Sequence, residues 1–250
     1  MIAIKNSEQI AGIRRACQLA RLCLTELEGH LFVGQNTEAL NQFAHSFIVG
    51  HHAIPATLNY HGFPKSICTS LNDVVCHGIP SSQSILKDGD ILNIDVTVIL
   101  GGFYGDTSKT YIIGDAPEDV CLFVSRAERA MSKGIGILKA GIKLSQLGKT
   151  IESFVQKFGY SVVREYGGHG VGLEFHEPPH IHHYQNRLSN ILLKEGMIFT
   201  VEPMINKSKN YNVRTCKNDG WTVYTADKSL SAQFEHTVLI TSTGCEILTI

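Results

Sequence analysis

Four acidic residues lie in segments whose other residues are mostly apolar. They are Asp95, Asp106, Glu202 and Glu235, and His169 stands in a glycine-rich run over residues 167–172. Charged side chains are rarely fully buried unless paired, so a single glutamate in such a strand would most simply face solvent. Four acids with a glycine-flanked histidine instead indicate a site for two divalent transition ions, and oxygen ligands with one imidazole favour Mn, Fe, Co or Zn. Two such ions would hold a water or hydroxide as a nucleophile at neutral pH.

The spacing of Asp95 and Asp106 suggests that they face each other across a β-hairpin. A two-residue loop at Leu100-Gly101 would place Asp95 directly opposite Asp106. Directly opposed side chains have Cβ atoms about 4.5–5.5 Å apart, where like charges repel. Two carboxylates so placed in an apolar setting must share a proton or bind a cation. A different register would leave one of them as a solvated turn residue.

Apolar residues recur with helical spacing in four segments. Helices are expected over residues 7–28, after Thr37 as a cap, over 117–138 from Pro117, and over 147–158 before Gly159. Strands are expected over residues 67–71, 74–79, 91–100, 103–113, 197–205 and 233–240. Helix pairs followed by strand runs, twice over, predict an α+β fold rather than alternating βαβ units.

The two halves of the chain resemble each other at a fixed offset. The matched segments are residues 87–91 before Asp95 with residues 194–198 before Glu202, Val33-Gly34 with Ala140-Gly141, and Leu40 with Leu147. We therefore expect one catalytic domain over residues 1–250, built from a duplicated half, with the halves at roughly 1–115 and 116–250. Asp95 and Glu202 would then occupy equivalent positions. The simpler explanation is a chance likeness of two segments that each form a turn and a strand.

Composition argues against several classes of protein. The 250 residues carry 22 Lys and Arg against 23 Asp and Glu, which argues against a nucleic-acid-binding face. The seven cysteines include no C-x-x-C pair, so a disulfide framework or zinc ribbon is not expected and a reducing compartment is favoured. No apolar run approaches the roughly 18 residues that span a bilayer, and residues 1–10 lack the features of a signal peptide. We expect a soluble, cytoplasmic monomer with no membrane partner.

Motifs spread along nearly the whole chain resemble those of the type I methionine aminopeptidases. They are residues 60–66 (YHGFPKS), 72–80 (NDVVCHGIP), 93–97 (NIDVT), 105–108 (GDTS), 168–172 (GHGVG), 175–177 (FHE), 202–204 (EPM), 219–221 (DGW) and 229–236 (SLSAQFEH). The resemblance implies a pita-bread fold, in which two pseudo-symmetric α+β halves enclose a site for two metal ions.

The resemblance also implies a role for each acidic residue and for His169. Asp95 chelates one ion, and Asp106 and Glu235 bridge both ions. His169 and Glu202 complete the ligands of the second ion. Glu202 is in addition the expected general base for the bridging hydroxide that attacks the scissile carbonyl.

Two further histidines and an apolar pocket follow from the same resemblance. His77 and His176 are expected to contact the substrate beside the scissile amide and to stabilise the charge that develops there. The pocket for the methionine side chain corresponds to Tyr60, Phe63, Cys68, Phe175 and Trp221. Aromatic walls and a sulfur suit a thioether. The backbone around Asn72 and Val74, with Ser231, matches a site for a monovalent cation, Na or K.

The implied activity is removal of the initiator methionine from nascent polypeptides whose second residue is small, with the ribosome as the place where such chains are met. Aminopeptidase P and prolidase share the fold and metal set, but they carry an additional N-terminal domain that is not expected here. A pita-bread protein that serves only as an interaction module is the other alternative. It is disfavoured because all five ligands and both flanking histidines are present. Glu174, in a variable position, is expected to add an acid near the site.

Overall fold

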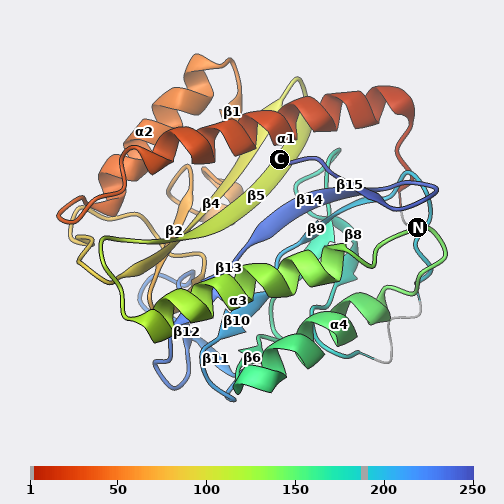
Figure 1. The fold of residues 1–250 in the computed structure, drawn as a ribbon. Coiled ribbons are helices and arrows are strands. Elements are labelled where there is room, and N and C mark those ends of the chain that lie inside the picture. The colour runs from red at the N-terminus through yellow and green to blue at the C-terminus, as the bar shows by residue number, and fades with distance from the viewer. Residues whose placement is uncertain (1–2, 187–190) are drawn as a thin grey trace.

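Two pairs of helices pack on a long antiparallel sheet in the computed structural model, which describes residues 3–186 and 191–250 (Figure 1). The helices are α1 (Ser7–Glu28), α2 (Thr37–Gly50), α3 (Glu118–Ile135) and α4 (Ser145–Val155), with 3₁₀ turns at Tyr60–Gly62 and Gln156–Phe158. In this view α1 and α2 lie at the top and α3 and α4 at the bottom, with the sheet between them. The predicted α+β class is confirmed.

The sheet joins strands from both halves of the chain. Its strands are β1 (Ile54–Pro55), β2 (Cys68–Leu71), β4 (Ile91–Leu100), β5 (Phe103–Ile112), β7 (Gly168–Gly170), β8 (Glu177–Ile181), β9 (Ile198–Val201), β14 (Glu235–Ile240) and β15 (Cys245–Ile247). Their order is β1-β4-β5-β14-β9-β7-β8, with β2 beside β4 and β15 beside β14. Smaller sheets are formed by β3 (Val74–Cys76), β11 (Val213–Thr215) and β12 (Val223–Thr225), and by β6 (Ser161–Val162), β10 (Met204–Asn206) and β13 (Ser231–Gln233). The β5–β14 pairing joins the two halves at the centre of the main sheet.

Side-chain caps determine where the first two helices begin. A capping box at Asn6 starts α1, which spans the predicted residues. The prediction that Thr37 caps α2 is wrong, because the Asn36 side chain accepts the cap hydrogen bond from Ala39 N at 2.9 Å. The Thr37 hydroxyl instead donates to the Ser81 carbonyl oxygen at 3.1 Å.

The two later helices end at glycines. α3 stops at Ile135, with Gly136 after it, and does not continue to the predicted residue 138. Glycine is a poor helix former, which accounts for the early end. α4 continues as a 3₁₀ turn to Phe158, and Gly159 then takes a left-handed conformation with φ 77°, as expected.

Each helix pair has its own hydrophobic core against the sheet. The first includes Ala16, Ala20, Leu24, Leu27, Leu40, Leu92, Ile94, Val96 and Val98. The second includes Phe123, Ala127, Met131, Leu147, Ile151, Phe199, Val201 and Val238. Because side chains alternate along a strand, Leu92, Ile94, Val96 and Val98 of β4 pack against the helices, while Asn93, Asp95 and Thr97 point to the opposite face. The helices thus leave a polar face of the sheet for the site.

The β4–β5 hairpin has a different register from the one predicted. Its loop is Gly101-Gly102, one residue later than expected, and both glycines adopt positive φ (59° and 83°) as a primed turn requires. Asp106 consequently lies opposite Thr97, and Asp95 lies opposite Ser108. The prediction that the two aspartates lie directly opposite each other is therefore wrong, because the partner of Asp95 is two residues further along β5. An even shift keeps each side chain on its face of the sheet, so Asp95 and Asp106 are diagonal neighbours on one face.

Backbone hydrogen bonds recur at the same offset of 107 residues in the two halves. Matched pairs are Gly34 N to Leu86 O with Gly141 N to Leu193 O (both 2.8 Å), Leu86 N to Gln35 O (2.8 Å) with Leu193 N to Ile142 O (2.9 Å), and Asp90 N to Lys87 O with Met197 N to Lys194 O (both 3.2 Å). These matches support the interpretation of a duplicated half, and the boundaries near residue 115 stay a prediction.

All seven cysteines are free, as the sequence leads us to expect. In the described part of the chain, no helix combines the length and the apolar character that crossing a membrane requires.

The packing of α1 on β5 predicts a large effect of one added methyl group. A Cβ on Gly105 would lie 2.2 Å from the backbone carbon of Ala16 and 2.3 Å from Cys17 N, so the helix would have to move. Gly105→Ala should therefore lower the free energy of unfolding by about 3 kcal/mol. Gly50→Ala is the control, because among the described residues no atom lies within 4 Å of its added Cβ apart from its chain neighbours and the adjacent backbone of its own helix. Urea unfolding of both variants measures the difference, and equal effects would contradict the packing.

Candidate metal centre

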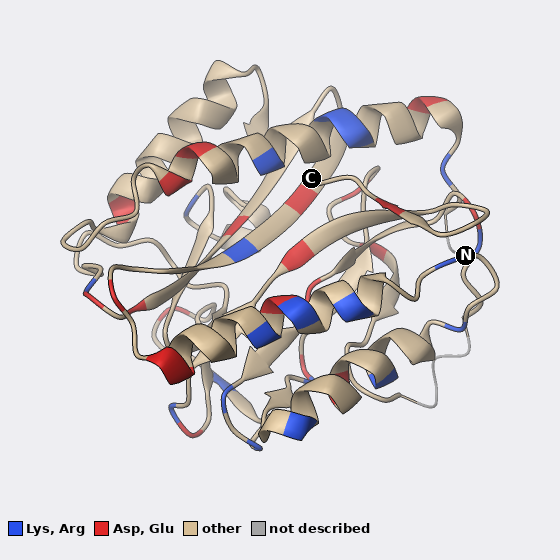
Figure 2. Ribbon diagram, viewed as in Figure 1, with Lys and Arg blue, Asp and Glu red and all other residues tan. Residues whose placement is uncertain are grey.

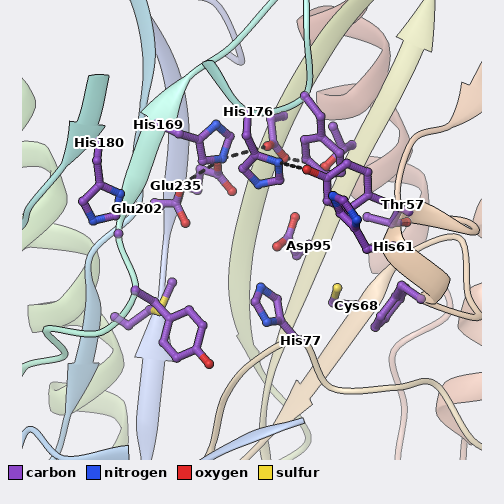
Figure 3. A pocket seen from close by; sticks show the side chains of 18 of the residues that line it. Thr57, His61, Cys68, His77, Asp95, His169, His176, His180, Glu202 and Glu235 are labelled. Carbon is purple, nitrogen blue, oxygen red and sulfur yellow. Dashed lines mark hydrogen bonds and ion pairs between the residues drawn. The ribbon is translucent and has the colours of Figure 1, made fainter. Parts of the chain in front are cut away.

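All twelve predicted metal-ligand, catalytic and pocket residues line one cavity of about 620 Å³. They are Tyr60, Phe63, Cys68, His77, Asp95, Asp106, His169, Phe175, His176, Glu202, Trp221 and Glu235. Figure 3 shows His169, Glu202 and Glu235 on one side of the cavity and Cys68 on the other, with Asp95 and His77 between them. Acidic positions are visible within the central strands in Figure 2. The fold thus brings the predicted residues together, and their individual roles stay predictions.

Two of the predicted strands are interrupted beside acidic residues of the cavity. The run over residues 197–205 is divided into β9 and β10 at Glu202-Pro203, and the run over 233–240 is divided into β13 and β14 at Phe234. Proline has no backbone N–H and cannot continue a ladder, which explains the first break. Each interruption lies next to the point where the chain directs a glutamate, Glu202 or Glu235, into the cavity.

Three carboxylates form a compact cluster. Asp95, Asp106 and Glu235 each offer an oxygen atom, and these atoms lie within 4.8 Å of one another. Among the described residues, Asp95 Oδ1 and Glu235 Oε1 are buried without a hydrogen-bond partner. Leaving a buried oxygen without a donor costs free energy, and a cation would supply the missing partner. The cluster therefore fits a metal ion.

His169 and Glu202 extend this cluster. His169 Nε2 lies 3.5 Å from Glu202 Oε1 and 3.7 Å from Asp106 Oδ2. The other ring nitrogen, Nδ1, lies 3.0 Å from the Gly170 carbonyl oxygen, to which it can only donate a hydrogen. In the neutral ring this leaves a lone pair on Nε2, directed toward the carboxylates, as a metal ligand requires.

Burial raises the pKa of all four carboxyl groups. The pKa of Asp106 is raised to about 7, although a hydrogen bond from Thr97 opposes the shift. The pKa values of Asp95, Glu202 and Glu235 are also raised, first by burial and further by the neighbouring acids. Carboxylates this close in an apolar setting cannot all be ionised at neutral pH without a cation. The raised pKa values and the buried oxygens without partners thus both indicate that the cluster binds a cation.

The site histidines are neutral at pH 7. Burial, with a smaller effect from His176, lowers the pKa of His169 to about 3 and that of His77 to about 4. The His77 ring packs edge-on against Trp221, with ring centroids 6.0 Å apart. His176 Nδ1 lies 2.8 Å from the Tyr60 hydroxyl. Neutral imidazoles can bind a metal or donate one hydrogen bond each.

The remaining wall of the cavity is largely apolar. Its aromatic side chains contact one another, with ring centroids 5.3 Å apart for Phe63 and Trp221 and 4.7 Å apart for Tyr60 and Phe175. Cys68 pairs with Asp95 across β2 and β4, which places the buried thiol beside the carboxylate cluster. An apolar, sulfur-containing pocket therefore adjoins the candidate metal centre.

Sequence reasoning missed the residues that orient the carboxylates. The Thr97 hydroxyl donates to Asp106 Oδ1 at 2.7 Å, and the Thr200 hydroxyl donates to Glu202 Oε1 at 2.6 Å. The Gln233 amide donates to Glu202 Oε2 at 3.2 Å. A signal for both threonines was present, because Thr97 lies two residues after Asp95 and Thr200 lies two residues before Glu202, a spacing that places side chains of an extended chain on one face.

His183 contacts the candidate site although the sequence did not indicate it, and Glu174 lies outside the cavity although the sequence placed it nearby. His183 is buried, and its Nε2 accepts a hydrogen bond from the backbone N–H of Glu202 at 3.1 Å. No motif pointed to it. Glu174, in contrast, is exposed and does not line the cavity as far as the described residues define it.

Comparison with known proteins agrees with this geometry. The model of metallopeptidase family M24 matches residues 11–242. The methionine aminopeptidase of Escherichia coli (strain K12) is 49% identical over 253 residues, covering 100% of this chain and 94% of that protein. The crystal structure of methionine aminopeptidase from Rickettsia prowazekii is 51% identical, with a TM-score of 0.97 over 100% of both chains.

A more distant structure separates fold from activity. The X-Pro aminopeptidase from Thermotoga maritima MSB8 is 21% identical, with a TM-score of 0.77 over 99% of this chain and 62% of that one. This likeness shows the fold alone, and together with the closer matches it confirms the predicted pita-bread architecture. The far higher identity to the methionine enzymes favours them over the X-Pro enzymes. The chain belongs to metallopeptidase family M24, within the group of bacterial methionine aminopeptidases.

Proposed function

We propose that the protein hydrolytically removes an N-terminal methionine from nascent polypeptides whose second residue is small, including chains met at the ribosome. The observation that carries the proposal is the adjacency of two features in one cavity. A buried carboxylate and imidazole cluster that fits metal ions lies directly beside an aromatic pocket containing Cys68. The identity to methionine aminopeptidases over the whole chain supports it.

The donor set is suited to two divalent ions of the Mn, Fe, Co or Zn type. Asp95 would hold one ion, Asp106 and Glu235 would hold both, and His169 and Glu202 would hold the other. When bound, such ions would make a water acidic enough to act as the nucleophile at neutral pH, once a base takes its proton. The two buried oxygens without partners, on Asp95 and Glu235, support this assignment.

Glu202 is the proposed general base. Thr200 and Gln233 hold its two carboxylate oxygens, which fixes the direction in which it can accept a proton from the attacking water. The same carboxyl group can then pass the proton to the leaving amine.

His77 and His176 are the proposed hydrogen-bond donors to the substrate. A Tyr60 hydroxyl that donates to His176 Nδ1 leaves the ring hydrogen on Nε2, where it can stabilise negative charge on the scissile carbonyl oxygen. The methionine side chain would occupy the pocket of Tyr60, Phe63, Cys68, Phe175 and Trp221.

A monovalent cation, Na or K, is proposed near Asn72, Val74 and Ser231. Ser231 N donates to the Asn72 carbonyl oxygen at 2.9 Å, and Asn72 has a left-handed backbone with φ 53°. This closeness of the two segments supports the assignment.

His77→Asn tests the role of His77. His77 has φ 56°, and asparagine tolerates this conformation, so the backbone should be preserved. We expect kcat for a Met-Gly peptide to fall about 100-fold, because a donor to the developing charge is lost. Metal content, measured by mass spectrometry, should equal that of the wild type. Loss of bound metal would show that His77 is a ligand instead.

A further inference from the structure

The segment that precedes α1 reaches the back of the proposed site through Lys5. The Lys5 ammonium pairs with Glu177 Oε2, and the side chains are only 1% and 7% exposed. Glu177 lines the cavity and follows His176 directly in the chain. Lys5 thus contacts the residue that directly follows two of the proposed substrate-binding residues, Phe175 and His176.

The Glu177 carboxylate holds this loop, which we define as residues 172–176, by its backbone. Its other oxygen, Oε1, accepts hydrogen bonds from Leu173 N at 2.7 Å and from Glu174 N at 3.2 Å. The two donors come just before Phe175 and His176, so the carboxylate closes the loop on itself. One buried side chain therefore links the loop conformation to Lys5.

On its cavity side the loop is held by aromatic contacts. Phe175 packs against Tyr60 with ring centroids 4.7 Å apart, and His176 lies 4.2 Å from the His169 ring. These contacts orient the Phe175 and His176 side chains relative to the proposed metal centre. They form only if the loop backbone is in the right position, and Glu177 holds that backbone through its hydrogen bonds to Leu173 N and Glu174 N.

Lys5 is itself fixed by its main chain. Lys5 N donates to the Gly196 carbonyl oxygen at 2.9 Å, and Gly196 N donates to the Ile240 carbonyl oxygen at 3.0 Å. A Cβ on Gly196 would lie 3.1 Å from the Lys5 carbonyl oxygen, so the two backbones are in close contact. Gly196 precedes β9, which ends just before Glu202. The backbone of Lys5 is thus attached to the segment that leads into β9, a strand of the sheet that carries the proposed ligands.

We propose that Lys5 is a positioning residue, which acts through Glu177 to hold the loop of residues 172–176 in the conformation that binds substrate. The inference rests on the proposed function and assigns the segment before α1 a part in it. A buried carboxylate that loses its partner is strongly unfavourable, so without Lys5 the Glu177 side chain is expected to leave its position and to release Leu173 N and Glu174 N.

The test compares Lys5→Met with Lys5→Arg and with the double variant Lys5→Met/Glu177→Gln. Methionine keeps the apolar bulk without the charge, and arginine keeps the charge. In the double variant, the neutral glutamine oxygen can still accept from Leu173 N and Glu174 N without needing a cation. Lys109→Met is the control, because it breaks the pair with Glu28 on the outside of the sheet, where the side chains are 44% and 46% exposed.

Two measurements are made on each metal-loaded protein. Amide hydrogen exchange of residues 171–177 should be at least about tenfold faster in Lys5→Met than in the wild type, with residues 91–112 unchanged. For a Met-Gly peptide, kcat/KM should fall about tenfold to a hundredfold with a raised KM, since misplacement of substrate-binding groups by about 1 Å has effects of this size. In Lys5→Arg and in the double variant, the exchange rates and the KM should return most of the way to the wild-type values. Lys109→Met should match the wild type in both measurements.

Wild-type exchange and KM in Lys5→Met would overturn the proposal. So would a uniform rise in exchange that includes residues 91–112, or a loss of kcat with KM unchanged, because these indicate a general loss of stability. The exchange measurement needs no substrate. Absence of methionine release by the wild type would therefore refute the proposed function, while the exchange result would still decide the link between Lys5 and the loop.

Discussion

Asp106→Asn is expected to abolish peptide cleavage and, in the absence of metal, to stabilise the protein. An amide cannot replace the carboxylate that is proposed to hold two cations, so kcat/KM should fall by about 10⁴-fold, or about 5.5 kcal/mol of transition-state stabilisation. Bound metal should fall below two ions per chain. The stabilisation follows because the substitution removes a carboxyl group whose own pKa is raised by burial and whose charge raises the pKa values of Asp95, Glu202 and Glu235.

The stability effect has a definite dependence on pH. The pKa of Asp106 is about 7 in the fold against an ordinary value of 3.8, so the folded state binds this proton more tightly than the unfolded state. Its contribution to the stability of the metal-free protein is therefore complete below pH 4 and is lost as pH rises through 7. The gain in melting temperature of Asp106→Asn over wild type should thus grow between pH 4 and 7.

Asp119→Asn, on the surface of α3, is the control and should leave activity unchanged. Full activity in Asp106→Asn would contradict the two-metal assignment.

Divalent metal should stabilise the protein strongly. A ligand at 100 times its dissociation constant adds about 2.7 kcal/mol per site, which for a domain of this size corresponds to a rise in melting temperature of about 5–10 °C. Differential scanning calorimetry of the metal-free protein with added Mn²⁺ or Co²⁺ measures the effect.

This stabilisation by metal should be greater at pH 8 than at pH 6. The raised pKa values of Asp95, Glu202 and Glu235 mean that metal must compete with protons for these groups at the lower pH. Mg²⁺ at equal concentration is a useful comparison, since it prefers an all-oxygen octahedral site without imidazole. A melting temperature that no transition ion changes would contradict the proposed centre.

Much of the fold could be predicted from local pattern. The strand-like apolar run over residues 91–100 forms β4 as predicted. Helical periodicity located α1 over residues 7–28. In both segments the residues of the buried face recur over the whole length, which makes the pattern easy to recognise in the sequence.

The exact loop of the β4–β5 hairpin and the cap of α2 could not be predicted, because neighbouring residues in each place were about equally suitable. Leu100-Gly101 and Gly101-Gly102 both make plausible hairpin loops, and the second was adopted because both central residues need positive φ. Asn36 and Thr37 are both good helix caps, and the contact of Thr37 with Ser81 decided between them. These differences leave the site intact, since Asp95 and Asp106 stay on one face of the sheet.

The candidate site was accessible from the sequence because its residues occur in recognisable motifs. Two supporting residues, Lys5 and His183, were not accessible in this way, because only three-dimensional contacts reveal their roles. Nothing in the sequence around Lys5 or His183 shows that one pairs with Glu177 and the other accepts from the Glu202 backbone. Such contacts join residues 172 and 19 positions apart and arise only when the sheet closes.

Release of free methionine from Met-Gly-Met-Met, after metal removal and after readdition of Mn, Co or Fe, tests the proposed function most directly. Met-Pro tripeptides serve as a second substrate. We expect no release from the metal-free protein and release from Met-Gly-Met-Met once metal is restored. No release with any of these metals, from protein shown to be folded, would contradict the proposed function and favour a non-catalytic pita-bread interaction protein. Cleavage confined to X-Pro bonds would contradict it in favour of an aminopeptidase P activity.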